Sequence, residues 1–445
     1  MRARSGTERS DEMLTVNAKG STSRLLGIGL VAALVLICSA GGVRAQSTLG
    51  AASDLTGGYV VLPKIMVHTT GGTPAVLPGG QQYDTLIQLS NTNELDLITV
   101  DCWWVNANSH CADTGIICET NADCVAAGVP GLNCVPGWSV NDFTVTLTAG
   151  QPLGFLASTG LTGVPCEVPP DEPPVCIGGI ADGGIDAVVE DPFRGELKCV
   201  QVDENDIPVE RSDLKVEATI VSTTVPGGSD PGTTTAASYN PIGFETIEVG
   251  TGAAADPLCL GAAPTGSDVD CAATYAPCPA ELKLNHFFEG AQTDIGGVVN
   301  TDLTLVPCSE ALGDPDVQAN FEVLAQMLVY NEFEQRFSTS ARIECYRATT
   351  LSDIDTARGP TGDEFSIFSV GIQGTIAGQT RIRGVQGSGG PLGYGLLGVA
   401  CENYREVLGG PVLATTAFNL DQRGTHEGGD AVYRTVFPDP VPPPP

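Results

Sequence analysis

The chain contains 445 residues, enough for two or three domains of ordinary size. Its net charge of −32 argues against a nucleic acid or an anionic membrane as partner, because both would repel it. The apolar content of 42% excludes a wholly disordered chain, and only four histidines are available for imidazole-based active sites.

The N-terminus has the pattern of a secretory signal peptide. A basic flank precedes an apolar run at 25–37, and the small residues Val43 and Ala45 occupy the −3 and −1 positions of a cleavage site. Residues 1–45 are therefore expected to be removed, with Met13 as an alternative start. No later stretch is long and apolar enough to span a bilayer, so the mature chain is expected without a transmembrane segment. We expect an exported protein that is periplasmic, surface-bound or extracellular.

Fourteen of the 15 cysteines follow this leader, and an even number in an exported chain indicates disulfides. No Cys-x-x-Cys spacing occurs, which argues against zinc ribbons and thioredoxin-like redox chemistry. Cys166 and Cys176 flank a proline-rich stretch and are expected to close a loop. Two groups of four are expected to pair internally, each with three possible connectivities: Cys111, Cys118, Cys124 and Cys134, and Cys259, Cys271, Cys278 and Cys308.

Segments in which apolar and polar residues alternate recur along the chain, separated by Gly- and Pro-rich turns. This period of two is typical of half-buried strands, and no long amphipathic helix is indicated. The clearest segments are 96–104, 142–147, 193–199, 214–219, 281–288, 301–306, 339–346 and 412–417. The pattern predicts an all-β protein of antiparallel sandwiches with disulfide-stapled loops and little helix.

Three blocks recur in the same order and predict an internal duplication. They pair 96–104 with 339–346, 142–147 with 364–368, and 193–219 with 397–417. The alternative is that two Thr- and Val-rich halves resemble each other only in composition.

The duplication and a turn-rich boundary near 223–232 define two tandem β-sandwich domains. The expected order is a signal peptide at 1–45, a first domain at 46–235, a second domain at 236–437 and a Pro-rich tail at 438–445. The first domain would carry Cys-rich insertions at about 106–140 and 163–190.

Four cysteines occupy matching places in the proposed repeats and face the apolar side of their strands. We expect one buried bridge per domain, Cys102 with Cys199 and Cys345 with Cys401. Closing loops of this size stabilises a fold by about 3 to 5 kcal/mol on the chain-entropy model.

Two aromatic residues are candidates for ligand binding. Trp103 is expected on the outward face of its strand, with Tyr346 at the matching place in the second domain. An exposed flat ring can stack on the apolar face of a sugar, whereas cover by loops or by the neighbouring domain would make both rings structural.

An acidic turn is the candidate metal site. Asp203, Asn205 and Asp206 cluster oxygen atoms between two strands, and such clusters can bind Ca²⁺. A solvated acidic turn without an ion is the alternative. No other cofactor is expected.

Catalytic motifs are missing from the sequence. Neither a Gly-x-Ser-x-Gly elbow nor His-Glu-x-x-His occurs, so we expect no enzyme. The favoured hypothesis is an exported structural or adhesive protein that presents loops from a disulfide-bonded β scaffold to a protein or glycan at the cell surface. A carbohydrate- or calcium-binding module is the second hypothesis, and a secreted hydrolase is the third.

Overall fold

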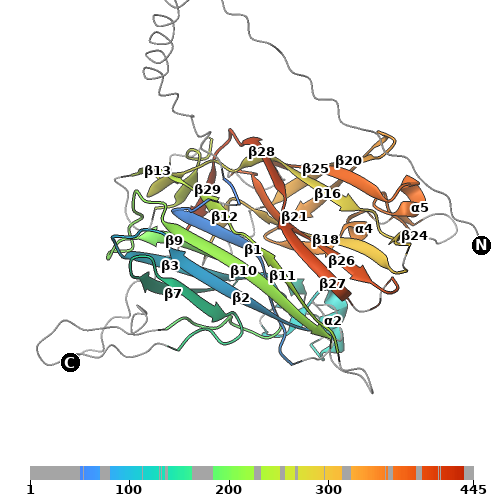
Figure 1. Ribbon diagram of the computed structural model, residues 1–445, viewed down its shortest axis with the longest axis horizontal. Helices are drawn as coiled ribbons and strands as arrows, with labels where there is room; N and C mark the ends of the chain where they lie inside the picture. The colour runs from blue at the N-terminus through green and yellow to red at the C-terminus, as the bar shows by residue number, and fades with distance from the viewer. Residues whose placement is uncertain are drawn as a thin grey trace, which may run out of the picture. The chain divides into compact units, whose positions relative to one another are not determined.

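Antiparallel β-sheets account for nearly all the regular structure in the computed structural model (Figure 1). It describes residues 51–434 except 54, 71–80, 113, 130, 132, 136–138, 163–183, 225–231, 251–255, 266–268, 295, 313–321, 356, 359–363, 387–392, 409 and 411. The helices there are short: α2 (Asn121–Ala126), α4 (Leu351–Ile354) and α5 (Val370–Gln373). The prediction of an all-β fold with little helix is confirmed.

The first sandwich consists of two sheets with an apolar core between them. Sheet A has the order β12 (Ile242–Phe244), β1 (Tyr59–Val67), β9 (Phe193–Val202), β3 (Ile98–Asn106) and β7 (Ser139–Leu147). Sheet B has the order β11 (Thr234–Tyr239), β10 (Leu214–Thr224), β2 (Gln81–Asn91) and β8 (Pro152–Leu156). Alternate side chains along the strands of both sheets fill the core, including Leu62, Ile87, Leu89, Trp104, Leu197 and Val216.

The second sandwich is built in the same way. Sheet C has the order β21 (Arg336–Ile343), β20 (Val323–Asn331), β25 (Ala377–Gln386), β16 (Pro279–Phe287) and β28 (Asp421–Thr425). Sheet D contains β17 (Ala291–Gln292), β18 (Val298–Pro307), β26 (Leu396–Arg405) and β27 (Val412–Asn419), and β22 (Arg347–Thr350) also pairs with β18. The core between them includes Leu284, Phe288, Leu303, Met327, Ile382 and Ala400.

The two sandwiches have the same strand order. Sheet A, read β12-β1-β9-β3-β7, corresponds to sheet C, read β28-β16-β25-β20-β21. Sheet B, read β11-β10-β2-β8, corresponds to β27-β26-β18-β22 of sheet D. The nine strands of sheets A and B follow one another along the chain in the same order as their nine counterparts in sheets C and D. Both the connectivity and the strand pairing of the two sandwiches therefore agree.

Individual residues follow this correspondence at the junction of β3 with β9 and of β20 with β25. Asn106 lies opposite Gly195 in the first pair, and Asn331 lies opposite Gly378 in the second. Each asparagine accepts, through Oδ1, the N–H of the residue two positions later, at 3.0 Å in both cases. In this register Lys198 of β9 corresponds to Arg381 of β25.

The repeat blocks predicted from the sequence are not the equivalent segments. They match β3 with β21 and β9 with β26, but β3 and β9 are neighbours in sheet A, whereas β21 and β26 belong to different sheets. The predicted duplication is therefore not confirmed in that form. The structural counterparts of β3 and β9 are β20 and β25.

A small fifth sheet covers the outer face of sheet A. Sheet E has the order β13 (Thr246–Val249), β15 (Ala273–Tyr275), β14 (Leu258–Leu260), β29 (Asp430–Tyr433) and β19 (Glu310–Ala311). Because sheet A is thus covered on both faces, nearly every residue of β1 and β9 is buried. The cluster between sheets A and E includes Tyr59, Trp103, Val200, Phe244, Leu258, Tyr275 and Val432.

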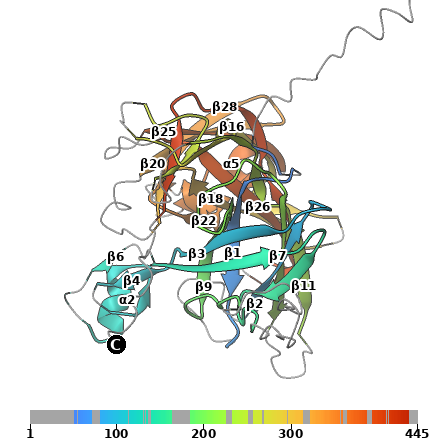
Figure 2. The same ribbon diagram turned by 90° about the vertical axis from the view of Figure 1, so that its left-hand side faces the viewer.

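Disulfides staple both the core and the loops. Cys102 and Cys199 are bonded as predicted, and they lie directly opposite each other on β3 and β9. The four-cysteine groups pair as Cys111–Cys124, Cys118–Cys134, Cys259–Cys271 and Cys278–Cys308. The first two bridges hold a module of α2 with β4 (Ser109–Cys111), β5 (Ile117–Cys118) and β6 (Cys134–Val135), which Figure 2 shows beside the sheets.

The predicted bridge between Cys345 and Cys401 is wrong, because both side chains are buried free thiols. Cys401 lies on the face of β26 that packs against the core of the first sandwich, together with Val399 and Ala417. Cys345 follows the end of β21 in the opposite sheet. The sequence comparison equated β21 with β3 and β26 with β9, and because β3 and β9 carry a disulfide, it wrongly predicted one between Cys345 and Cys401.

Several predictions concern residues near or beyond the limits of the described chain. The strands of the first sandwich continue through β11 and β12 to Phe244, past the predicted boundary at 235. The signal peptide, the loop bridge between Cys166 and Cys176, and the tail at 438–445 lie outside the described residues. None of the described helices is long and apolar enough to cross a membrane.

Candidate functional site

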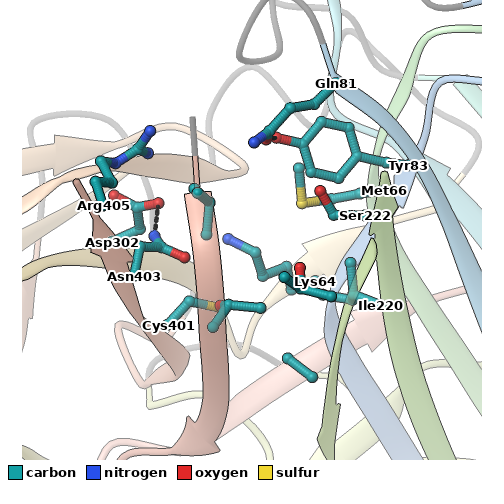
Figure 3. A pocket seen from close by; sticks show the side chains of 14 residues that line it. Lys64, Met66, Gln81, Tyr83, Ile220, Ser222, Asp302, Cys401, Asn403 and Arg405 are labelled. Carbon is teal, nitrogen blue, oxygen red and sulfur yellow. Dashed lines mark hydrogen bonds between the residues drawn. The ribbon is translucent and has the colours of Figure 1, made fainter. Parts of the chain in front are cut away.

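An interior pocket lies between the two sandwiches (Figure 3). Strands β1, β2, β10 and β11 of the first sandwich line one side, and β18, β26 and β27 on the outer face of sheet D line the other. Its volume is about 60 Å³, which is room for a few water molecules or one small ligand. The first sandwich supplies Lys64, Tyr83 and Ser222, and sheet D supplies Asp302 and Arg405. Pockets between packed domains are common ligand sites.

Lys64 is the most unusual residue of this pocket. It is only 6% exposed, and its ammonium donates one hydrogen bond, to Oγ1 of Thr304 at 3.1 Å. No described carboxylate lies within 4.0 Å of Nζ. Burial alone would lower the pKa of Lys64, but Cys401, Tyr346 and Asp302 outweigh it and raise the pKa above its usual value.

The acidic residue of the pocket is already engaged by neutral donors. Asp302 accepts hydrogen bonds from Nδ2 of Asn403 at 2.6 Å, from Oγ1 of Thr350 at 3.1 Å and from Nδ2 of Asn300 at 3.2 Å. The Nε of Arg405 donates to Asn300 at 3.0 Å. Two cations and one anion thus line the pocket, which leaves it with a net positive charge.

The second candidate is a groove across the outer face of sheet C. Two adjoining hollows of about 800 and 530 Å³ lie on this face, and Arg381 lines both. The larger hollow also contacts Tyr330, Gln379 and Asn285, which lie on neighbouring strands in one row. The pairing of the strands therefore brings one aromatic ring, two amides and a guanidinium together, and the carboxylates of Glu332, Glu334 and Glu402 line the same hollow.

Arg381 is available for a ligand. Its guanidinium lies 5.2 Å from the centroid of the Tyr330 ring, in a cation–π arrangement, and its buried Nε has no hydrogen-bond partner. The neighbouring Arg383, by contrast, donates twice to Oε2 of Glu281, at 2.8 and 2.7 Å. Lys283 lies directly opposite Arg381 on β16 and adds a second positive charge.

The corresponding face of the first sandwich is closed. Lys198, the counterpart of Arg381, is 1% exposed and lies between the carboxylates of Glu196 and Glu310. Glu310 belongs to β19, so sheet E itself contributes a carboxylate to this cation. Burial raises the pKa of Glu196 to about 7, although Lys198 opposes the shift. Burial likewise lowers the pKa of Lys198.

The two aromatic residues predicted for sugar stacking are not on an open surface. Trp103 is 6% exposed and packs between sheets A and E, and Tyr346 packs against the same cluster. The predicted outward orientation of Trp103 is correct, but a further layer covers that face. By strand order and register its counterpart is Leu328 rather than Tyr346.

The acidic turn predicted for Ca²⁺ is closed by its own side chain. Oδ1 of Asp203 accepts the N–H groups of Asn205 at 2.8 Å and Ile207 at 3.0 Å. Burial raises the pKa of Asp203, but these hydrogen bonds outweigh it and lower the pKa below its usual value. Asp206 has a left-handed backbone with φ of 59°, as the turn requires. Among the described residues, this turn brings no three acidic, His or Cys ligand atoms within 4.8 Å.

One Ser, His and Asp cluster resembles a catalytic triad in composition but not in arrangement. Nδ1 of His426 lies 2.7 Å from Oδ2 of Asp430, while Ser309 donates to Oδ1 of Asp430 at 2.9 Å. The carboxylate thus lies between serine and histidine, whereas nucleophilic catalysis requires the histidine to bond the serine. The described groups of possible metal ligands consist of disulfide sulfurs, joined in one case by Asp430.

Lys64, Arg405, Tyr330 and Arg381 were not predicted from the sequence. A lysine in the otherwise apolar run of β1 was a usable signal, because buried lysines are rare. Arg381 carried no comparable signal. No protein-family model matches the chain, and a search of the curated proteins finds no match either.

Proposed function

We propose that the protein is an exported, non-enzymatic adhesive or structural protein that binds a glycan on the outer face of sheet C. The observation that carries this proposal is the groove of about 800 Å³ centred on Arg381 and Tyr330. In the part of the chain that the structure describes, sheet E occupies the equivalent face of the first sandwich, and no layer covers this one.

The chemistry of the groove suits such a ligand. The ring of Tyr330 can stack on a sugar, and Arg381, which has no carboxylate within ion-pair distance among the described residues, can donate to sugar hydroxyls. The carboxylates of Glu332, Glu334 and Glu402 can accept from such hydroxyls. The amides of Asn285 and Gln379 can bond sugar hydroxyls.

Two further observations bear on export and on hydrolase chemistry. The described disulfides are compatible with an oxidising compartment, as the leader predicts. The arrangement of Ser309, His426 and Asp430 argues against a serine hydrolase.

Binding to an immobilised neutral glucan tests this function. We expect retention on this polymer, little retention on a uronic-acid polymer because the chain is strongly acidic, and loss of about tenfold in affinity in Arg381→Ala because one charge-assisted contact disappears. Lys215→Ala is the matched control, since Lys215 is an exposed cation of sheet B. Equal retention on both polymers, or by Arg381→Ala, would contradict the proposal, and fractionation of the native cells tests export independently.

A further inference from the structure

We infer that the pocket between the sandwiches is a binding site for a small aliphatic monocarboxylate, such as acetate or butyrate, that bridges Lys64 and Arg405. This site is separate from the groove of sheet C and does not depend on the proposed function. It rests on the cavity, on a buried ammonium with unused donors, and on the composition of the walls (Figure 3).

The donors of the pocket require an acceptor. The Lys64 ammonium has three N–H groups and uses one for Thr304. A buried charge without a partner costs several kcal/mol, so the two remaining donors need a ligand or ordered water. Figure 3 shows the amine directed into the space between the labelled residues of the two sandwiches.

Charge selects an anion of low valence. Asp302 balances one of the two cations and is itself bonded to three neutral donors, so it does not occupy the remaining positions on Lys64. The pocket then carries one excess positive charge. A monoanion neutralises it, whereas a dianion would leave a buried negative charge.

The walls select a ligand with an apolar end. Met66, Ile220, Ala237 and Val412 line the same pocket as the cations. An inorganic anion such as chloride would leave these side chains facing water, whereas an alkyl chain of two to four carbons would cover them. The volume of about 60 Å³ limits the chain to this length.

Methyl NMR of the wild-type chain tests the inference without a variant. The four methionines are Met1, Met13, Met66 and Met327, of which Met66 lines the pocket and Met327 lies in the core of the second sandwich. With ¹³C-methyl methionine we expect saturable shifts of the Met66 signal on addition of sodium butyrate. The Met327 signal should stay in place and serve as internal control, and Met327→Leu assigns it.

Three further titrations complete the test. Butyramide, the neutral analogue, should leave the Met66 signal unmoved, and so should sodium chloride and sodium phosphate at matched ionic strength. Lys64→Met keeps the apolar stem and should weaken butyrate binding about tenfold or more, because a charge-assisted hydrogen bond is lost. Lys215→Met is the surface control and should bind as the wild type does.

Each contrary outcome overturns the inference. A Met66 signal that does not respond to butyrate means that there is no carboxylate site. An equal response to butyramide removes the role of the charge, and an equal response to chloride or phosphate removes the selectivity for an organic carboxylate. Unchanged butyrate affinity in Lys64→Met removes Lys64 from the site.

Discussion

Two sheets of the same strand order face different surroundings in this protein. The outer face of sheet A is apolar at Val61, Trp103 and Val105 and lies under sheet E, whereas the equivalent positions of sheet C are Lys283, Leu328 and Tyr330. The framework is therefore independent of what covers it. A change of a few outward side chains converts a solvent face into an internal interface, because alternate residues of a strand contribute separately to its two faces.

The two interiors are also held together differently. Cys102 and Cys199 form a disulfide between β3 and β9. The equivalent residues of the second sandwich, Met327 and Ile382, lie opposite each other on β20 and β25 and form no covalent bond. In the first sandwich, sheet E covers the outer face of sheet A, and sheet D packs against the core. In the second sandwich, the outer face of sheet C carries the groove.

The largest expected effect comes from the bridge that distinguishes the two cores. Cys102→Ala with Cys199→Ala should lower the free energy of unfolding by about 4 to 5 kcal/mol, since the bridge closes a loop between residues 97 apart. Urea unfolding measures this. Cys345→Ala is the control, a buried free thiol whose loss should cost only about 1 kcal/mol. Equal losses in the two variants would refute the special role of the bridge.

Removing the positive charge should reduce the stability of the protein much more at Lys198 than at its counterpart Arg381. Lys198→Met leaves Glu196 and Glu310 buried without a cation and should cost about 3 to 5 kcal/mol. Arg381→Met, on the open face, should change stability by less than about 0.5 kcal/mol. Denaturant melts of both variants decide whether the covered and open faces differ in energy as the structure implies.

The equivalent glycines should differ in their tolerance of a methyl group. A Cβ on Gly195 would lie 2.0 Å from the carbonyl oxygen of Val105, whereas one on Gly378 would lie 2.4 Å from the Phe288 ring and 3.0 Å from the carbonyl of Tyr330. Because a ring shifts more easily than a paired backbone, Gly195→Ala should cost about 1 to 3 kcal/mol and Gly378→Ala less. The two melting temperatures compare them directly, and a larger loss in Gly378→Ala would contradict this reasoning.

The smallest effect concerns protonation of Glu196, whose counterpart in sheet C is the neutral Gln379. Because burial raises the folded pKa to about 7 from the usual 4.5, the folded state binds more protons between these values. This group therefore reduces stability as pH rises from about 4.5 to about 7. Glu196→Gln should flatten that part of the pH profile of unfolding. A profile identical to wild type would show that Glu196 does not titrate in this range.

The sequence predicted the architecture better than the correspondence of its parts. The alternation within 96–104 and 193–199 correctly indicated neighbouring core-facing strands, and it predicted the bridge of Cys102 with Cys199. Matching cysteine to cysteine then misaligned the halves, because Met327 and Ile382 replace the bridge in the second sandwich. Strand positions were preserved where residue identities were not.

The candidate sites were harder to predict than the fold. Trp103 has the outward direction expected of a ligand-binding ring, but direction within a strand does not reveal a layer contributed by residues 246–249, 258–260, 273–275, 310–311 and 430–433. Lys64 and Arg405 are 341 positions apart in the sequence, and the pocket forms only where sheet D closes the first sandwich. No local sequence pattern indicates that two residues so far apart line the same pocket.

The amino-acid sequence by itself determined the β character, the strand periodicity and the disulfide that joins neighbouring strands, because these depend on local alternation and on cysteine placement. Tertiary structure alone decided which outer face is covered, which lysine is buried and where cations meet across the two sandwiches. Those features arise from contacts between segments hundreds of residues apart, and their energies depend on what excludes water at each position.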